Sequence, residues 1–200
     1  MNGEYFKAMD DDKFFDMALP YFNEYIENNF SAKETTSIRF TDNGAVIEGL
    51  VTGDTITTEG DHILVKAHNE GLVLKVSGKS ENGSLRIYSD KKFELLLSDT
   101  QICNPEGAAI NIQSGNCFVV LEGGNILSDG STAKYVKTND EDEKAVFFSE
   151  DDLRFSGKGS LNIVAANSYG KSCLASDDAL FFRSGISLKL QAGASAGHGV

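Results

Sequence analysis

The chain repeats itself near its C-terminal end. The segments SEDDLRFSGKGSLNI, which begins at Ser149, and SDDALFFRSGISLKL, which begins at Ser176, lie 27 positions apart and align without a gap. Apolar residues fall on apolar residues, as Leu153 does on Leu180. Each segment reads as two short alternating strands joined by a glycine turn, so the repeat predicts stacked β units that share one core.

Weaker repeats precede this one. An offset of 35 aligns the residues from Ile112 onward with those from Phe147 onward. An offset of 25 aligns the residues from Leu85 onward with those from Ile110 onward. The aligned pairs include Ile112 with Phe147, Phe118 with Leu153, Ile126 with Leu161, Leu85 with Ile110 and Phe93 with Phe118. The longer spacing is absorbed by the polar segment DGSTAKYVKTNDEDEK, which is typical of a loop.

A repeat of this length with two or three short strands is the signature of a solenoid. It favours a mainly β fold, a right-handed parallel β-helix, over a propeller, whose blades need a longer period. A β-sandwich with accidental internal similarity is the alternative. We expect residues 36–200 to form the β-helix.

The N-terminal stretch has a different texture. Phe15, Leu19, Phe22 and Ile26 fall at helical spacing, which predicts one or two amphipathic helices. A β-helix exposes unpaired strand edges at its ends, so we expect residues 1–35 to form a helical cap. The C-terminal end lacks a comparable segment, and we expect further rungs or a partner chain there.

Charge and composition limit the possible functions. The chain carries 18 Lys and Arg against 30 Asp and Glu, a formal net charge of −12. This argues against binding nucleic acid or an anionic membrane surface without help. Its three cysteines show no metal-binding spacing and are expected to be buried, unreactive thiols. No apolar run is long enough for a membrane span, and no signal peptide is visible.

Catalytic signatures are lacking in the sequence. The three histidines, His62, His68 and His198, stand far apart without a nucleophile or carboxylate at a recognisable spacing. Neither of the two GKS triplets is preceded by the glycine that a phosphate loop requires. The sequence therefore predicts a protein that is not an enzyme.

Paired acids recur at one predicted turn. Asp151 and Asp152 precede one strand, and Asp177 and Asp178 precede the equivalent strand one repeat later. Stacked strands lie about 4.8 Å apart, so these carboxylates would repel one another unless a cation lay between them. Calcium takes six to eight oxygen ligands, and these four residues are its predicted ligands. The alternative is that the aspartates simply form turns facing water.

Four aromatic residues are candidates for stacking on sugar rings. Phe148 and Phe181 alternate with predicted core positions and are expected to point outward. Tyr135 and Tyr169 fall in predicted loops. Exposed aromatic faces offer apolar area at a small cost in side-chain entropy. Burial under the polar segment or a neighbouring domain is the alternative for each.

From about Leu72 to its end, the chain resembles a family of secreted bacterial β-helix proteins, the carbohydrate-binding-domain-containing proteins. The resemblance is carried by AVFFSEDDLRFS with GKGSLNI, by GKSCLASDDALFFRSGISLKL, and upstream by LRIYSDKKFELLLSDTQI, GAAINIQS and NILSDGS. It implies a right-handed parallel β-helix, calcium at the turns, an extracellular or cell-surface location, and binding of polysaccharides such as cellulose or acidic sugars without cleavage.

The leading hypothesis is thus a non-catalytic, calcium-stabilised polysaccharide-binding or surface-adhesion module. A structural or assembly β-solenoid is the alternative, supported by the uncapped C-terminal end. A calcium-dependent polysaccharide lyase is a third possibility, since Arg154 and Arg183 flank the relevant strands and lyase chemistry needs a base beside the metal.

Overall fold

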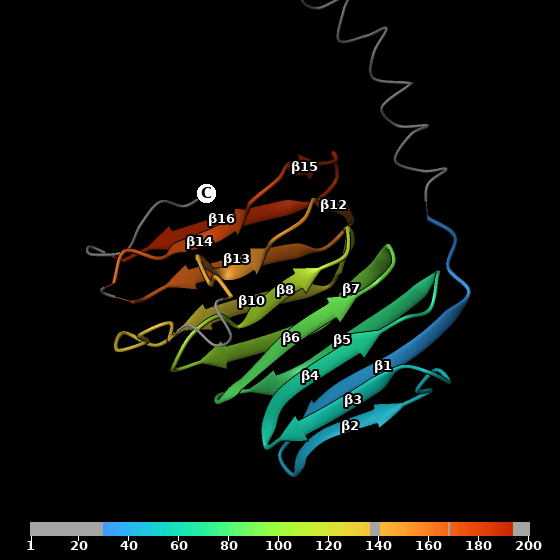
Figure 1. The fold of residues 1–200 in the computed structure, drawn as a ribbon. Coiled ribbons are helices and arrows are strands. Elements are labelled where there is room, and N and C mark those ends of the chain that lie inside the picture. Colours follow the sequence, from blue (N-terminus) through green and yellow to red (C-terminus); the bar gives the residue numbers. More distant parts are fainter. Residues whose placement is uncertain (1–29, 137–140, 168, 194–200) are drawn as a thin grey trace, which may run out of the picture. The chain divides into compact units, whose positions relative to one another are not determined.

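The computed structural model describes residues 30–136, 141–167 and 169–193. These residues form sixteen β-strands and no helix (Figure 1). The β-rich fold predicted from the sequence is therefore confirmed. The predicted helical cap, residues 1–35, lies outside the described residues up to residue 29, and its last two residues belong instead to strand β1 (Glu34–Thr41). The chain divides into two compact units, Met1–Ser31 and Ala32–Val200, and all sixteen strands belong to the second.

The strands form two sheets. The six-stranded sheet has the order β14 (Ser172–Ser176), β11 (Ala145–Ser149), β8 (Ile110–Ser114), β6 (Gly83–Ser89), β4 (Asp61–Ala67) and β3 (Thr55–Glu59). In Figure 1 it rises from β3 through β4, β6 and β8 to β14. Every pairing in it is parallel except that between β3 and β4.

The ten-stranded sheet is organised around the long strand β7 (Phe93–Asn104). One path runs through β9 (Cys117–Glu122), β12 (Leu153–Gly157) and β15 (Leu180–Phe182), and the other through β10 (Gly124–Asp129), β13 (Ser160–Ala165) and β16 (Ser187–Ala192). Strands β1 (Glu34–Thr41), β2 (Gly44–Glu48) and β5 (Leu72–Ser80) complete it. Only the β1–β2 pairing is antiparallel.

The 27-residue repeat is borne out by the strand register. Leu153 pairs with Leu180, and Leu161 pairs with Leu188. We call a strand of the six-stranded sheet, together with the strands of the ten-stranded sheet that follow it in the chain, a repeat. The repeats are β4–β5, β6–β7, β8–β10, β11–β13 and β14–β16. The 25-residue offset also holds where Leu85 pairs with Ile110.

Elsewhere the alignments predicted with offsets of 25 and 35 residues were wrong by one or two residues. Cys117, not Phe118, pairs with both Phe93 and Leu153. In the six-stranded sheet Phe147 pairs with Ile110 rather than Ile112. A shift of one residue moves a side chain to the opposite face of its strand.

The same shift affects β10. Ile126, predicted to align with the core residue Leu161, is 39% exposed. Asn125 takes that place, pairing with Leu161, and is buried. Its side chain accepts a hydrogen bond from the Thr100 amide at 2.9 Å and donates to the carbonyls of Glu122 and Ser160. These bonds make a polar side chain acceptable inside the fold.

The core is a stack of apolar side chains from successive repeats. One ladder joins Leu95, Val119 and Phe155, all of which are buried. Phe182 continues this ladder and stacks on Phe155 with ring centroids 5.2 Å apart. Phe182 lies in the last repeat and is 47% exposed.

The three cysteines are free. Cys117 and Cys173 are buried, as predicted, and burial raises the pKa of both thiols. A raised pKa keeps a thiol protonated and unreactive. Cys103 is only half-buried.

At the N-terminal end of the described sheets the parallel pattern stops. Strands β2 and β3 run antiparallel to β1 and β4. Val51, between them, joins the core cluster, and Ala45, Ile47 and Ile56 pack against it. This end is therefore covered by antiparallel strands and their connection.

Candidate functional site

A groove of about 430 Å³ crosses the outer face of the six-stranded sheet. Buried residues on these strands alternate with residues that point away from the core. The outward residues line the groove, and they are mostly polar. They include Thr57 and Glu59 from β3, His62 from β4, Ser84 and Arg86 from β6, and Asn111 from β8.

The parallel register brings these side chains together. His62 is paired in register with Ser84 on one side and with Glu59 on the other. Its Nδ1 atom lies 2.9 Å from the Ser84 hydroxyl. Arg86 is paired in register with Asn111. Residues that are 22 to 25 positions apart in the chain thus become neighbours across the sheet.

One wall of the groove comes from the segment that separates β10 from β11. We call residues 130–144 the insertion. Glu143 lines the groove and forms an ion pair with Arg86. Asn111 donates a hydrogen bond to the same carboxylate at 2.9 Å. Glu141 lies 3.6 Å from the Arg86 guanidinium and accepts a hydrogen bond from Tyr88.

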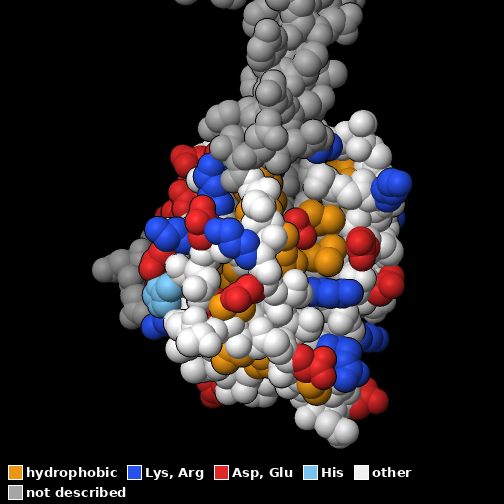
Figure 2. All heavy atoms as spheres, turned by 90° about the vertical axis from the view of Figure 1, so that its right-hand side faces the viewer, with side chains coloured by type: hydrophobic (Ala, Val, Ile, Leu, Met, Phe, Trp, Pro, Cys, Tyr) orange, Lys and Arg blue, Asp and Glu red, His pale blue; other side chains and the backbone are white. Residues whose placement is uncertain are grey.

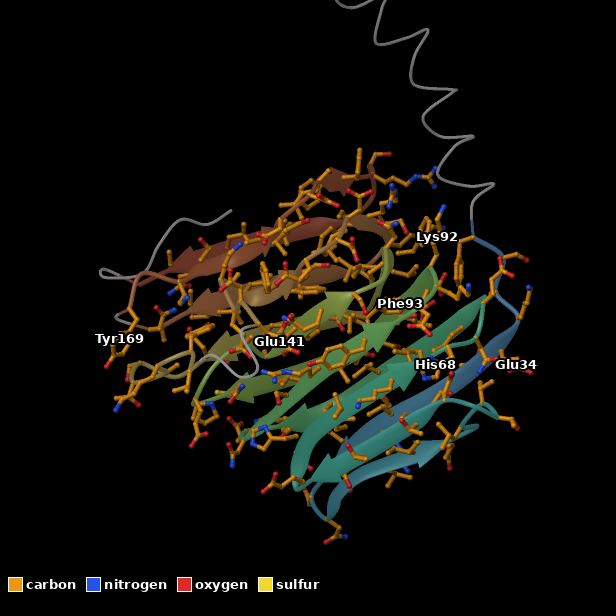
Figure 3. The ribbon with its side chains drawn as sticks, viewed as in Figure 1. Glu34, His68, Lys92, Phe93, Glu141 and Tyr169 are labelled. Carbon is orange, nitrogen blue, oxygen red and sulfur yellow. The ribbon has the colours of Figure 1, made fainter. Side chains whose placement is uncertain are left out.

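These contacts place Glu141 over the middle of the strands, where Figure 3 labels it. Burial, and next the hydrogen bond to Glu141, raise the pKa of Tyr88 to about 12. The phenol therefore stays protonated and keeps donating to the carboxylate at physiological pH. The wall is held by neutral and charged hydrogen bonds together.

The other described part of the insertion is anchored by Tyr135, which packs with Ala108 and Ala133. Its hydroxyl donates to the buried Asp129 carboxylate at 2.8 Å. Burial is the largest cause that raises the pKa of Tyr135, followed by the neighbouring Asp129 charge. The Lys171 ammonium donates to the Glu143 carbonyl at 2.7 Å, which ties the insertion to the next loop.

The groove lining offers mainly hydrogen-bonding groups. The His62–Ser84 pair looks like part of a nucleophilic site, but such a site also needs donors for an oxyanion. Two side-chain amides of the lining already donate within the chain, Asn111 to Glu143 and Asn104 to the Ala108 carbonyl. The groove therefore presents fixed donors and acceptors.

Two of the four predicted stacking residues are buried, so their predicted exposure was wrong. Tyr135 is 5% exposed and has Lys171 over its ring. Phe148 is 0% exposed, and the Lys144 ammonium lies 5.5 Å from its ring centre. Lys144 ends the insertion, so the alternative of burial under this segment fits Phe148.

The other two predicted stacking residues keep accessible surface. Tyr169 is 55% exposed and extends away from the strands at the edge of the molecule (Figure 3). Phe181 is half-buried, with the Arg154 guanidinium 5.0 Å from its ring centre. Arg154 also lies 5.6 Å from the Phe118 ring, so the arginine occupies the space between the two aromatic side chains.

Three of the four predicted calcium ligands have partners within the chain, and the fourth, Asp178, is exposed. Asp152 pairs with Arg154 at 2.7 Å, and Asp177 pairs with Lys144. Asp151 accepts a hydrogen bond from the Gly115 amide at 2.8 Å. Across the described ranges, no group of three or more His, Cys, Asp or Glu is arranged to hold a metal ion. The four residues as placed do not fit a shared calcium site, because cations of the chain itself neutralise two of them.

Sequence reasoning missed the groove. Its residues come from β3, from three repeats and from the insertion, and its polar strand residues are mostly ordinary outward positions. The one feature of the sequence that could have indicated the groove is the alternation of Ser84, Arg86 and Tyr88, which are polar or amphipathic, with core positions. Only the strand register shows that His62 and Asn111 flank that run.

The described strands form an all-β domain with a largely polar groove on its six-stranded sheet. The model of the family of carbohydrate-binding domain-containing proteins matches residues 55–200. This is well over half of the chain, so the chain belongs to that family. The match begins at Thr55, the first residue of β3, and includes all strands that line the groove. Neither the curated proteins nor the solved structures gave a match.

None of the residues that the structure describes forms a helix with the length and apolar character that a membrane span requires.

Proposed function

We propose that this protein is a non-catalytic carbohydrate-binding module that holds a polysaccharide in the groove of the six-stranded sheet. The observation that carries the proposal is the groove itself, about 430 Å³ and lined by hydroxyl, amide, imidazole and carboxylate groups. Membership of the carbohydrate-binding family supports it. We further propose that the successive repeats form a right-handed parallel β-helix, on which the groove runs across stacked strands.

The groove chemistry suits sugar hydroxyls, which both donate and accept hydrogen bonds. Thr57 and Ser84 offer hydroxyls, and Glu59 offers an acceptor. The groove wall is held in place by Glu143 and Arg86 before any ligand arrives. Binding then costs less ordering of the protein than a mobile wall would. Tyr169 is proposed as a stacking residue outside the groove.

Blocking the groove tests this function. A Ser84→Trp variant places a large side chain in the groove on an outward strand position that tolerates aromatic residues. Calorimetry with β-1,4-linked oligosaccharides should show binding to the unmodified protein and loss of at least roughly ten-fold in affinity for Ser84→Trp.

The matched control is Ser156→Trp, at a half-buried position of β12 in the other sheet. It should bind as the unmodified protein does. Equal binding by both variants would move the glycan site away from the groove. Absence of binding to every oligosaccharide and polysaccharide offered would overturn the proposed function.

Assembly is a second candidate function, favoured by the last repeat. Leu180, Leu188 and Leu190 are only partly buried there, and Phe182 is 47% exposed. A partner that adds strands to this edge would cover them. Light scattering at increasing protein concentration tests this, and a Phe182→Asp variant should stay monomeric if the edge is used.

A lyase is less well supported than either. Arg154 pairs with Asp152 and lies between two phenyl rings. A guanidinium held in this way is a poor proton acceptor, since arginine stays protonated in proteins. A cell-surface location is part of the proposed function, and fractionation of the source cells tests it.

A further inference from the structure

The groove carries more negative than positive charge. Arg86 is its one lysine or arginine among the described lining residues, and two glutamates of the insertion neutralise it. The Glu143 side chain is 10% exposed and the Glu141 side chain 19% exposed. Arg86 is therefore not available to a carboxylate of an incoming ligand without displacing a carboxylate of the chain.

Glu59 adds a second, uncompensated charge. It is exposed on β3, next to His62, and the described residues give it no ion pair. With Arg86 pairing one of the two insertion carboxylates, the lining keeps an excess of negative charge when His62 is neutral. A groove lined by one sign of charge concentrates ligands of the opposite sign.

The groove differs in this respect from another face of the molecule. Figure 2 shows that face, where acidic and basic side chains are interspersed around a small group of hydrophobic ones. The net charge of −12 thus includes a local excess inside the groove, where a ligand would feel it at short range.

We propose that the groove discriminates glycans by charge and prefers amino-sugar polymers, whose free amines are cationic, over neutral glycans and uronates. This rests on the proposed function. A protonated sugar amine would donate to the Glu59 carboxylate as a charge-assisted hydrogen bond. A uronate would meet Glu59 and the insertion glutamates and would find no free guanidinium.

Three matched oligosaccharides test this. A β-1,4-linked glucosamine hexamer and the corresponding glucose hexamer share their linkage and differ only at the second carbon of each ring, and a β-1,4-linked glucuronic acid hexamer keeps the linkage and supplies the opposite charge. Titrations at one neutral pH and low salt should give the highest affinity for the amine hexamer, a lower one for the neutral hexamer and the lowest for the acid. Each carboxylate engaged should give roughly a three- to five-fold preference.

A Glu59→Gln variant isolates the source of the preference. It should lower affinity for the amine hexamer more than affinity for the glucose hexamer, so that the two affinities converge. Added salt should produce the same convergence in the unmodified protein. The control is Glu48→Gln on β2, an exposed carboxylate outside the groove, and it should change neither affinity.

The outcomes separate this inference from the proposed function. If the glucose hexamer binds as well as the amine, or the acid binds best, the charge preference is wrong and carbohydrate binding stands. If the preference persists unchanged in Glu59→Gln, the amine is recognised elsewhere and the assignment to this groove fails. If no hexamer or parent polymer binds, the function itself fails.

Discussion

At the scale of single residues, the surroundings of a carboxylate decide whether its charge stabilises the fold. Asp129 is buried, yet it accepts hydrogen bonds from the Ala166 and Asn167 amides, the Asn167 side chain and the Tyr135 hydroxyl. Such a fully bonded carboxylate is well tolerated inside a protein. Glu150 shows the opposite case, because burial and the nearby Asp177 charge raise its pKa.

The Glu150→Gln variant should be more stable than the unmodified protein at neutral pH. A raised pKa in the folded state means that ionised Glu150 opposes folding above that pKa, and this cost disappears as pH falls towards the ordinary value of about 4.3. Thermal melts should show a rise in Tm of roughly 1–2 °C at neutral pH and none near pH 4. A lower Tm at neutral pH would show that Glu150 is instead stabilising.

At the scale of elements, the strand ends depend on a few backbone positions that exclude side chains. Gly157, the last residue of β12, has a φ of +109°. A Cβ atom there would lie 2.3 Å from the Leu121 carbonyl oxygen of the neighbouring strand. Both the dihedral angle and the close approach of the backbone therefore require glycine.

A Gly157→Ala variant should lose about 2–3 kcal/mol of unfolding free energy, measured by urea unfolding. The matched control is Gly60→Ala, because Gly60 also has a positive φ but has no atom within 4 Å of the place that a methyl group would take. That variant should lose only about 1 kcal/mol, the cost of the dihedral angle alone. Equal losses would remove the role assigned to the Leu121 contact.

The sequence predicted elements well where no residues intervene between repeats. The 27-residue offset matched because each turn between Ala145 and Ala192 has the same length in both repeats. Across the insertion the alignment slipped, because Asn125 occupies a core register position and apolar Ile126 beside it faces outward. Hydrophobic pattern alone favours the wrong residue of such a pair.

The site was harder to predict than the fold. Phe148 was expected on the outer face and at the surface, but the insertion buries it beneath Lys144. The groove depends on long-range partners such as Arg86 and Glu143, which are 57 positions apart. No local pattern in the sequence encodes that pairing, and charge alone does not choose among the many acidic residues.

At the scale of the whole molecule, the predicted calcium can be checked by stability. A cation that binds only the folded state raises Tm in proportion to the logarithm of its concentration. Because Arg154 and Lys144 already pair with Asp152 and Asp177, we expect millimolar calcium to change the Tm of EDTA-treated protein no more than magnesium at equal ionic strength. A calcium-specific rise would contradict this and restore the predicted metal site.

We expect the insertion to contribute more to the stability of the whole molecule than a surface loop would. An Arg86→Met variant leaves Glu141 and Glu143 mostly buried without their cation, so unfolding free energy should fall by about 2–3 kcal/mol. The control is Lys33→Met, which removes an ion pair to Glu70 whose two side chains are both more than half exposed. It should cost less than about 1 kcal/mol. If urea unfolding gave similar losses of unfolding free energy for the two variants, the insertion would not have the structural role proposed for it.

We also expect the insertion to set the order in which the repeats unfold. In a stack of repeats each unit touches only its neighbours, so unfolding can begin at one end and advance unit by unit. The insertion contacts Arg86 in one repeat, Asn111 in the next and Lys171 after β13. Those repeats must therefore unfold together, or the contacts that the insertion makes with them must break first. Hydrogen exchange should accordingly find one cooperative block from β6 to β13, with independent opening confined to the strands beyond it.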